Sequence, residues 1–255
     1  MFERILNPVA TTTIARTVSS LRRAIMQGDL RPGQKLIEGE LCRELEVSRP
    51  SLREALRALQ AEKLIDLVPN RGPSVAKLIA DDIEAIHEVW ALLTGEAVYD
   101  FTKVAKPAQK KSLANAIEVL RRSVEDNLPI KQLAATNDFF LVIMLGCGND
   151  VLTEMVFRLI SRINFLRSQA LIHQRCGVLY AGEIEAILGQ IKAGDAEGAR
   201  QATRKHIASA CSAAQALASV TSLGRPAAAR TTAGPAASAQ TPEGAARRVA
   251  AQRRS

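Results

Sequence analysis

The sequence feature that most constrains the fold is the order of segments in the first third of the chain. Apolar residues recur at helical spacing over 13–27 and 38–45. A third helix pattern follows Ser48, a residue type that favours helix N-caps. Two short β-forming stretches, 64–68 and 73–76, come next and are joined by a turn. Three helices followed by such a hairpin predict a winged helix-turn-helix, whose recognition helix enters the major groove of DNA.

Basic and hydroxyl side chains lie at the start of the third helix, away from its apolar stripe. Arg49 and Arg53 are one turn apart, and Arg is suited to bidentate contact with guanine or phosphate. Ser51 is placed to donate to a phosphate, and Arg71 at the tip of the wing to reach the backbone or the minor groove. An isolated pair of arginines is as often solvated surface charge. The complete order of helices and wing favours DNA contact.

The rest of the chain has helical patterns up to about residue 219. We expect six or seven helices from residue 83 onward and no strand, with breaks at Lys106-Pro107, 127–129, 146–149, Gly177 and Gly194-Asp195. The prediction is therefore a mainly α fold, in which a winged helix-turn-helix precedes an all-helical bundle. Its parts are a flexible arm at 1–10, a DNA-binding domain at 11–78, a helical domain at 79–222 and a disordered, basic, Ala/Arg-rich tail at 223–255.

Charge and cysteine usage narrow the class of protein. The 255 residues carry a net charge of +8. Residues 1–78 hold 13 Lys/Arg against 9 Asp/Glu, and residues 223–255 hold 6 Arg against one Glu. Basic ends suit a nucleic-acid partner. The four cysteines are widely spaced, so a zinc finger is not expected. No catalytic triad, phosphate loop, secretion signal or membrane-spanning run is recognisable, and we expect a cytoplasmic protein that is not an enzyme and does not contact membranes.

Residues 24–78 resemble the DNA-binding domain of the GntR family. The resemblance lies in "GDLRPGQKL", "ELCRELEVSRPSLREALRALQAEKLI" and "PNRGPSVA". It implies a homodimer, most often a repressor, on an inverted-repeat operator of double-stranded DNA. It also implies contacts from the recognition helix and the wing, at Arg49, Ser51, Arg53, Asn70, Arg71 and Gly72. A further family position, often Arg, is Gly39 here, and we expect Lys35 to substitute for it in part.

The region 80–219 is similar to the FCD domain of the FadR-like branch. The matching runs are "HEVWALLTGEAV", "TNDFFLVIMLGCGNDVL" and "EIEAILGQIKAGDAEGARQATRKHI". Many members hold a divalent metal with one Asp and three His, and the metal helps to bind a carboxylate effector. The corresponding positions here are Thr136, Phe140, Ile184 and His206. Only the last can ligate a metal, so we expect no metal and no other cofactor.

Two pocket positions that often carry Arg and Glu in that branch are Trp90 and Thr94 here. The expected effector pocket is the set Trp90, Thr94, Thr136, Phe140, Ile184 and His206. Because this set is poor in charge, it predicts an apolar or amphipathic small molecule that modulates operator binding. The alternative is a filled core, with the helical domain used only for dimerisation or partner contact. We expect His87 and His173 on the surface, and a hinge near residues 77–82.

Overall fold

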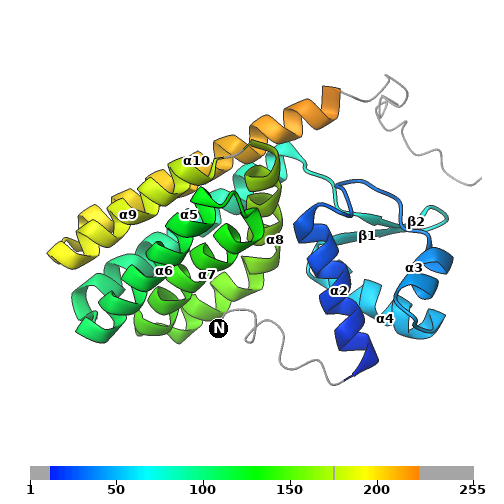
Figure 1. The fold of residues 1–255 in the computed structure, drawn as a ribbon, viewed down its shortest axis with the longest axis horizontal. Helices are drawn as coiled ribbons and strands as arrows, with labels where there is room; N and C mark the ends of the chain where they lie inside the picture. Colours follow the sequence, from blue (N-terminus) through cyan, green and yellow to red (C-terminus); the bar gives the residue numbers. More distant parts are fainter. Residues whose placement is uncertain (1–11, 175, 224–255) are drawn as a thin grey trace, which may run out of the picture. The chain divides into compact units, whose positions relative to one another are not determined.

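The computed structural model describes residues 12–174 and 176–223. The expectations for the arm at 1–10 and for the tail beyond Leu223 lie outside these residues. The described part of the chain contains nine helices and one two-stranded sheet (Figure 1). The predicted mainly α fold, with a winged helix-turn-helix before a helical bundle, is confirmed.

The N-terminal part, which we call the head, consists of three helices and a β-hairpin. Its elements are α2 (Thr13–Gln27), α3 (Glu38–Glu44), α4 (Arg49–Ala61), β1 (Ile65–Val68) and β2 (Gly72–Val75). The two strands are antiparallel and form the wing.

Local sequence chemistry fixes where the helices of the head begin and end. The side chain of Thr12 accepts a hydrogen bond from the Ala15 amide at 3.2 Å and caps α2. Gly28, with φ of 81°, ends that helix in the left-handed conformation. The apolar stripe of α4 includes Leu52 and Leu56, which pack in the core of the head. Burial of each such side chain contributes about 1.5–3 kcal/mol.

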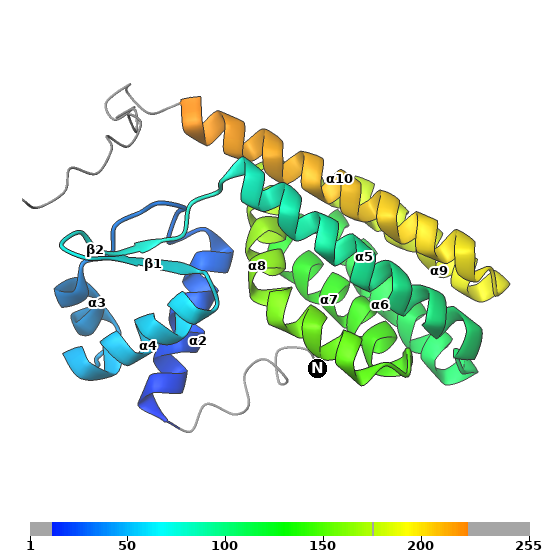
Figure 2. The same ribbon diagram turned by 180° about the vertical axis from the view of Figure 1, so that it is seen from behind.

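Six helices follow the head and form the bundle. They are α5 (Ala80–Val104), α6 (Pro107–Glu125), α7 (Pro129–Gly146), α8 (Asp150–Gln174), α9 (Gly177–Ala193) and α10 (Ala196–Leu223). The breaks between them fall at the expected Pro and Gly positions. α5 packs lengthwise on α10, and α6 packs on α7 and α9 (Figure 2).

Helix α8 contacts both the bundle and the head. It packs on α5, α7 and α10, and its other contacts include α2. Phe165 of α8 belongs to the apolar core of the head. The side-chain amide of Gln169 donates to the carbonyl of Ile25 in α2 at 3.2 Å, and the hydroxyl of Ser168 contacts Met26 Sδ at 3.6 Å. One helix therefore lines the interior of the bundle and holds the last turn of α2.

Candidate functional site

The first candidate surface is the N-terminal end of α4. Ser48 caps this helix, accepting a hydrogen bond from the Ser51 amide at 3.4 Å, and the two hydroxyls are 2.9 Å apart. Ser51 is half-buried, and in the free protein its hydroxyl is engaged with that of the capping residue Ser48. Arg49 is exposed and has no hydrogen bond or ion pair with another described residue. The amides of Ser51 and Leu52 already donate to Ser48. The exposed Arg49 side chain, at the positive end of the α4 dipole, therefore favours anionic groups at this end of the helix.

Arg53, one turn further along α4, is paired within the head. Its Nε donates to Glu38 Oε2 at 3.0 Å, and 61% of the Arg53 side chain is exposed. Glu38 is the first residue of α3, so this ion pair joins the two helices of the motif. This pairing was not predicted from the sequence. To contact DNA through both Nε and Nη atoms, Arg53 must exchange the Glu38 carboxylate for a base or a phosphate.

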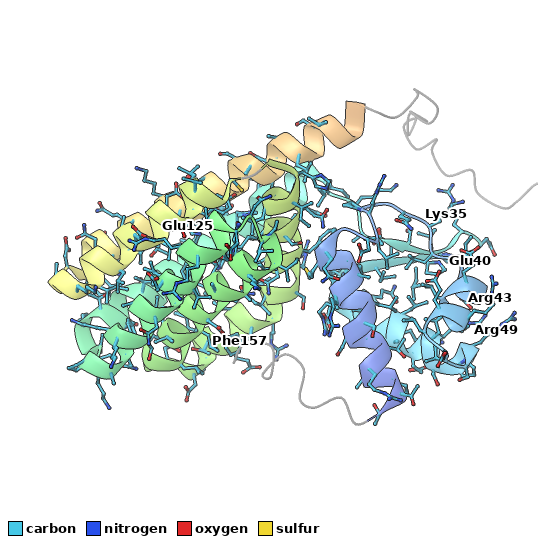
Figure 3. The ribbon with its side chains drawn as sticks, viewed as in Figure 1. Lys35, Glu40, Arg43, Arg49, Glu125 and Phe157 are labelled. Carbon is cyan, nitrogen blue, oxygen red and sulfur yellow. The ribbon has the colours of Figure 1, made fainter. Side chains whose placement is uncertain are left out.

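Helix α3 adds a basic residue that the sequence analysis overlooked. Arg43 is exposed, and its Nε donates to the Gly39 carbonyl at 3.3 Å. Lys35, Arg43 and Arg49 lie along one edge of the head, with Glu40 among them (Figure 3). A Cβ atom at Gly39 would meet nothing within 4 Å, so this position is open. The signal for Arg43 was its place on α3, opposite the buried Leu41.

The wing presents its polar residues at a tight turn. The Arg71 amide donates to the Val68 carbonyl at 3.0 Å across Pro69 and Asn70. Asn70 has φ of 61° and Gly72 has φ of 74°. Pro followed by a residue with positive φ defines a type II turn, and Asn tolerates that conformation. Arg71 is thereby held exposed at the tip.

Lys35 lies at the base of the wing. It forms a β-bridge with Ser74 of β2, so the chain before α3 runs along the second edge of that strand. Its side chain is exposed. The structure thus gives the predicted DNA-binding residues two locations, the start of α4 and the wing with its base.

The second candidate site lies inside the bundle. All six predicted pocket residues are buried, and three of them meet directly. The ring centres of Trp90 and Phe140 are 6.3 Å apart, and Phe140 stacks on His206 at 6.0 Å. Thr94 lies one turn beyond Trp90 on α5 and is buried, and its hydroxyl has no partner among the described residues.

The other two predicted pocket residues pack beside these. Thr136 precedes Phe140 by one turn of α7, and Ile184 belongs to the same apolar cluster as Phe140. The cavity beside Trp90 and Phe140 measures about 10 Å³. That is about the space of one water molecule, so the side chains nearly fill it.

A buried arginine, Arg167, stands in this interior, and the sequence analysis missed it. Its side chain lies against the Trp90 ring, with Cζ 4.8 Å from the ring centre, and it is 4% exposed. Nη1 donates to Asn137 Oδ1 at 3.0 Å, whereas Nε and Nη2 have no partner among the described residues. Burial lowers the pKa of Arg167 to about 10, so the group is charged at neutral pH. The six predicted pocket positions carry no fixed charge, but Arg167 adds beside them a positive charge that the sequence did not predict.

Histidines also differ from expectation. His206 is buried and hydrogen-bonded as expected, since its Nδ1 lies 2.9 Å from Glu183 Oε2. Burial lowers the pKa of His206. Burial alone would raise the pKa of Glu183, but hydrogen bonds from His206 and Ser209 together outweigh it and lower the pKa. The ionised carboxylate accepts, so Nδ1 carries the proton and Nε2 has a free lone pair.

His87 was expected on the surface and is buried instead, whereas His173 is exposed as expected. The Nδ1 of His87 lies 2.7 Å from the Ile83 carbonyl, and its ring centre lies 5.7 Å from that of Trp90. Burial lowers the pKa of His87. The structure thus adds His87 to the surroundings of Arg167.

Comparison with known proteins identifies both parts of the chain. The family model described as "Bacterial regulatory proteins, gntR family" matches residues 13–75, and the model described as "FCD domain" matches residues 85–209. The chain belongs to the GntR family. It is a DNA-binding transcriptional regulator with an FCD domain, and not an enzyme.

Relatives of this GntR-family regulator are diverged. It is 28% identical over 138 residues to an uncharacterized HTH-type transcriptional regulator of Agrobacterium vitis, covering 53% of this chain and 80% of the relative. It is 31% identical over 114 residues to the gluconate operon transcriptional repressor of Bacillus subtilis, covering 45% and 46%. A putative GntR regulator from a Rhodococcus species has the same fold, with a TM-score of 0.68, 21% identity, and coverage of 80% and 97%.

The metal that the FCD resemblance implied does not fit this GntR-family chain. Thr136, Phe140 and Ile184 occupy three of the four ligand positions, and they offer no carboxylate or imidazole. The described residues contain no group of three His, Cys, Asp or Glu that could hold a metal ion. The fourth position, His206, is already bonded to Glu183. Any ligand held in this interior would therefore have to be bound by other groups.

No described helix is both long and apolar enough to cross a lipid bilayer.

Proposed function

We propose that this regulator is a homodimeric repressor that binds an inverted-repeat operator and responds to a small molecule held in the bundle. Its heads contact DNA through the start of α4 and through the wing. The observation that best supports DNA binding is the exposed Arg49 at the capped N-terminus of α4, which has no partner among the described residues and lies beside Arg43 and Lys35. An edge that carries three basic side chains and includes a helix N-terminus suits the phosphate backbone and the major groove. The name of the Bacillus relative supports repression.

The DNA-binding part is tested with an operator selected from a random DNA pool. Fluorescence anisotropy then compares Arg49→Ala with the native protein. Because Arg49 is free to contact a base or a phosphate, its loss should weaken binding by about 1–3 kcal/mol, roughly 5- to 150-fold. The control is Arg158→Ala, an exposed, ion-paired Arg on α8 of the bundle. Equal affinities for Arg49→Ala and Arg158→Ala would exclude α4 as the recognition helix.

Modulation by a ligand is supported by the contacts of α8. Arg167 faces the interior, and the next two residues, Ser168 and Gln169, contact Met26 and Ile25 of α2. A ligand that moves Arg167 therefore acts on the helix that holds the head. The ligand shifts DNA binding only as far as it favours one arrangement of head and bundle over the other. We propose that ligand binding releases the operator.

The small cavity supports a second candidate, a bundle that binds no ligand and serves for dimerisation or partner contact. A thermal-shift screen with small metabolites distinguishes the two. A ligand that raises the melting temperature and lowers operator affinity supports the responsive repressor. In that case Gln169→Ala should keep the thermal shift and lose most of the effect on DNA. The absence of any stabilising compound, with normal operator binding, would favour the second candidate.

A further inference from the structure

Among the described side chains of the bundle, Arg167 has the most buried hydrogen-bond donors without a partner, since both Nε and Nη2 lack one. The guanidinium is charged and 4% exposed, yet no described carboxylate forms an ion pair with it. A buried charge without a counter-ion is costly, and proteins keep one chiefly where it has a role. The charge therefore requires a reason beyond the stability of the fold.

The orientation of the Arg167 guanidinium indicates which kind of ligand group its Nε and Nη2 atoms could bind. Asn137 holds Nη1, and the Trp90 and Phe140 rings lie 4.8 and 5.8 Å from Cζ. These contacts fix the plane of the guanidinium and leave Nε and Nη2 free. Nε and Nη2 form one edge of the group, and their two parallel N–H bonds match the two oxygens of a carboxylate.

The other side chains that line this cavity indicate what the rest of the ligand would be. Beside Arg167 and Asn137, the cavity is lined by the apolar side chains of Met144, Val156 and Ile160 as well as by the aromatic rings. Among the residues that the structure describes, the Tyr180 hydroxyl and His206 Nε2 have no partner of good geometry, although the Tyr180 hydroxyl lies near the Cys176 thiol. One cation in an apolar enclosure suits one negative charge on a compact apolar body. A dianion would leave its second charge unpaired.

We infer that Arg167 anchors a metal-free site for the carboxylate of a small organic monoanion, whose apolar body lies against Trp90 and Phe140. The inference rests on the proposed function in that the effector occupies the bundle. Arg167 supplies the positive charge that a metal supplies in other FCD domains. Room for the ligand comes from rearrangement of the wall, where the flexible thioether of Met144 adjusts most readily. The expectation of an amphipathic effector is kept, and its charged end is now assigned to Arg167.

The test is a thermal-shift and calorimetric titration without DNA. The probes are butyrate, hexanoate, benzoate and phenylacetate, with the corresponding amides as neutral controls and inorganic phosphate as a second oxyanion. At least one carboxylate should raise the melting temperature by several degrees near saturation, whereas its amide and phosphate should not. Failure of all four carboxylates, or equal shifts with the amides or phosphate, would overturn the inference.

Variants assign the effect to Arg167. Arg167→Met removes the charge at similar volume and should abolish the carboxylate shift, while Arg158→Met on the same helix should retain it. Arg167→Lys keeps the charge but loses the pair of parallel N–H donors, so its affinity for the carboxylate should fall at least 10-fold. This variant also tests the assignment if Arg167→Met does not fold. A carboxylate shift that survives in Arg167→Met or is undiminished in Arg167→Lys would refute the assignment. Carboxylate binding without any change in operator affinity would instead refute the proposed response while keeping this site.

Discussion

Glu38→Gln should tighten operator binding, because Glu38 competes with DNA for Arg53. In the free protein the Arg53 Nε lies 3.0 Å from Glu38 Oε2, and the side chains are 61% and 29% exposed. Exposed pairs of this kind are worth about 0.2–1 kcal/mol. Arg53 gives up this energy when it turns to a base or a phosphate. Removing the competitor should therefore raise operator affinity by about 1.5- to 5-fold, as measured by anisotropy.

The same substitution should lower the free energy of unfolding by up to about 1 kcal/mol, since Glu38 also lies at the N-terminus of α3. A double-mutant cycle with Arg53→Ala isolates the competition, and the gain should vanish in that background. Glu154→Gln removes the same charge from an exposed pair in the bundle and should leave affinity unchanged. Weaker binding by Glu38→Gln, or a gain that persists with Arg53→Ala, would refute the reasoning.

Three further outcomes are expected. Arg71→Ala at the tip of the wing should weaken operator binding about 3- to 10-fold. It should also reduce the slope of log affinity against log salt concentration by about one, as measured by titration at several salt concentrations. An unchanged slope would show that Arg71 does not contact a phosphate. Leu56→Ala should lower the free energy of unfolding in urea by about 2–5 kcal/mol, because the side chain is 1% exposed in the core of the head; a loss below 1 kcal/mol would contradict that packing. Chelation with EDTA should leave the melting temperature unchanged, because Thr136, Phe140 and Ile184 stand at the family's ligand positions, whereas near one equivalent of zinc, nickel or manganese by elemental analysis would contradict this.

Much of the head could be predicted because its signals are local. Ser48 caps α4, Gly28 ends α2, and Pro69-Asn70 fits a type II turn, each through hydrogen bonds or φ values set within a few residues. The apolar stripe of α4 marks its buried face, which leaves Arg49 on the exposed one. The breaks between the bundle helices were predictable for the same reason, since Pro and Gly act where they stand.

Interactions between distant segments were not predictable in this way. The Arg53–Glu38 pair joins residues 15 positions apart. They lie on two helices, and the hydrophobic periodicity of each helix does not reveal how the two cross. Helix α8 gave no clear amphipathic signal because it is contacted by α5, α7, α10 and the head. Polar side chains on such a helix are buried too, and Arg167 is one of them.

The sequence by itself determined that this protein carries a winged helix-turn-helix followed by a helical bundle, and that Arg49 and Arg71 lie exposed at the start of α4 and at the tip of the wing. Caps, turns and hydrophobic periodicity are properties of a few neighbouring residues, so they can be read in order along the chain. Only the tertiary structure decided that His87 is buried and that Arg167 is held unpaired between Trp90 and Asn137. Burial and pairing of a charge depend on which helices pack around it, and that is a property of the assembled bundle.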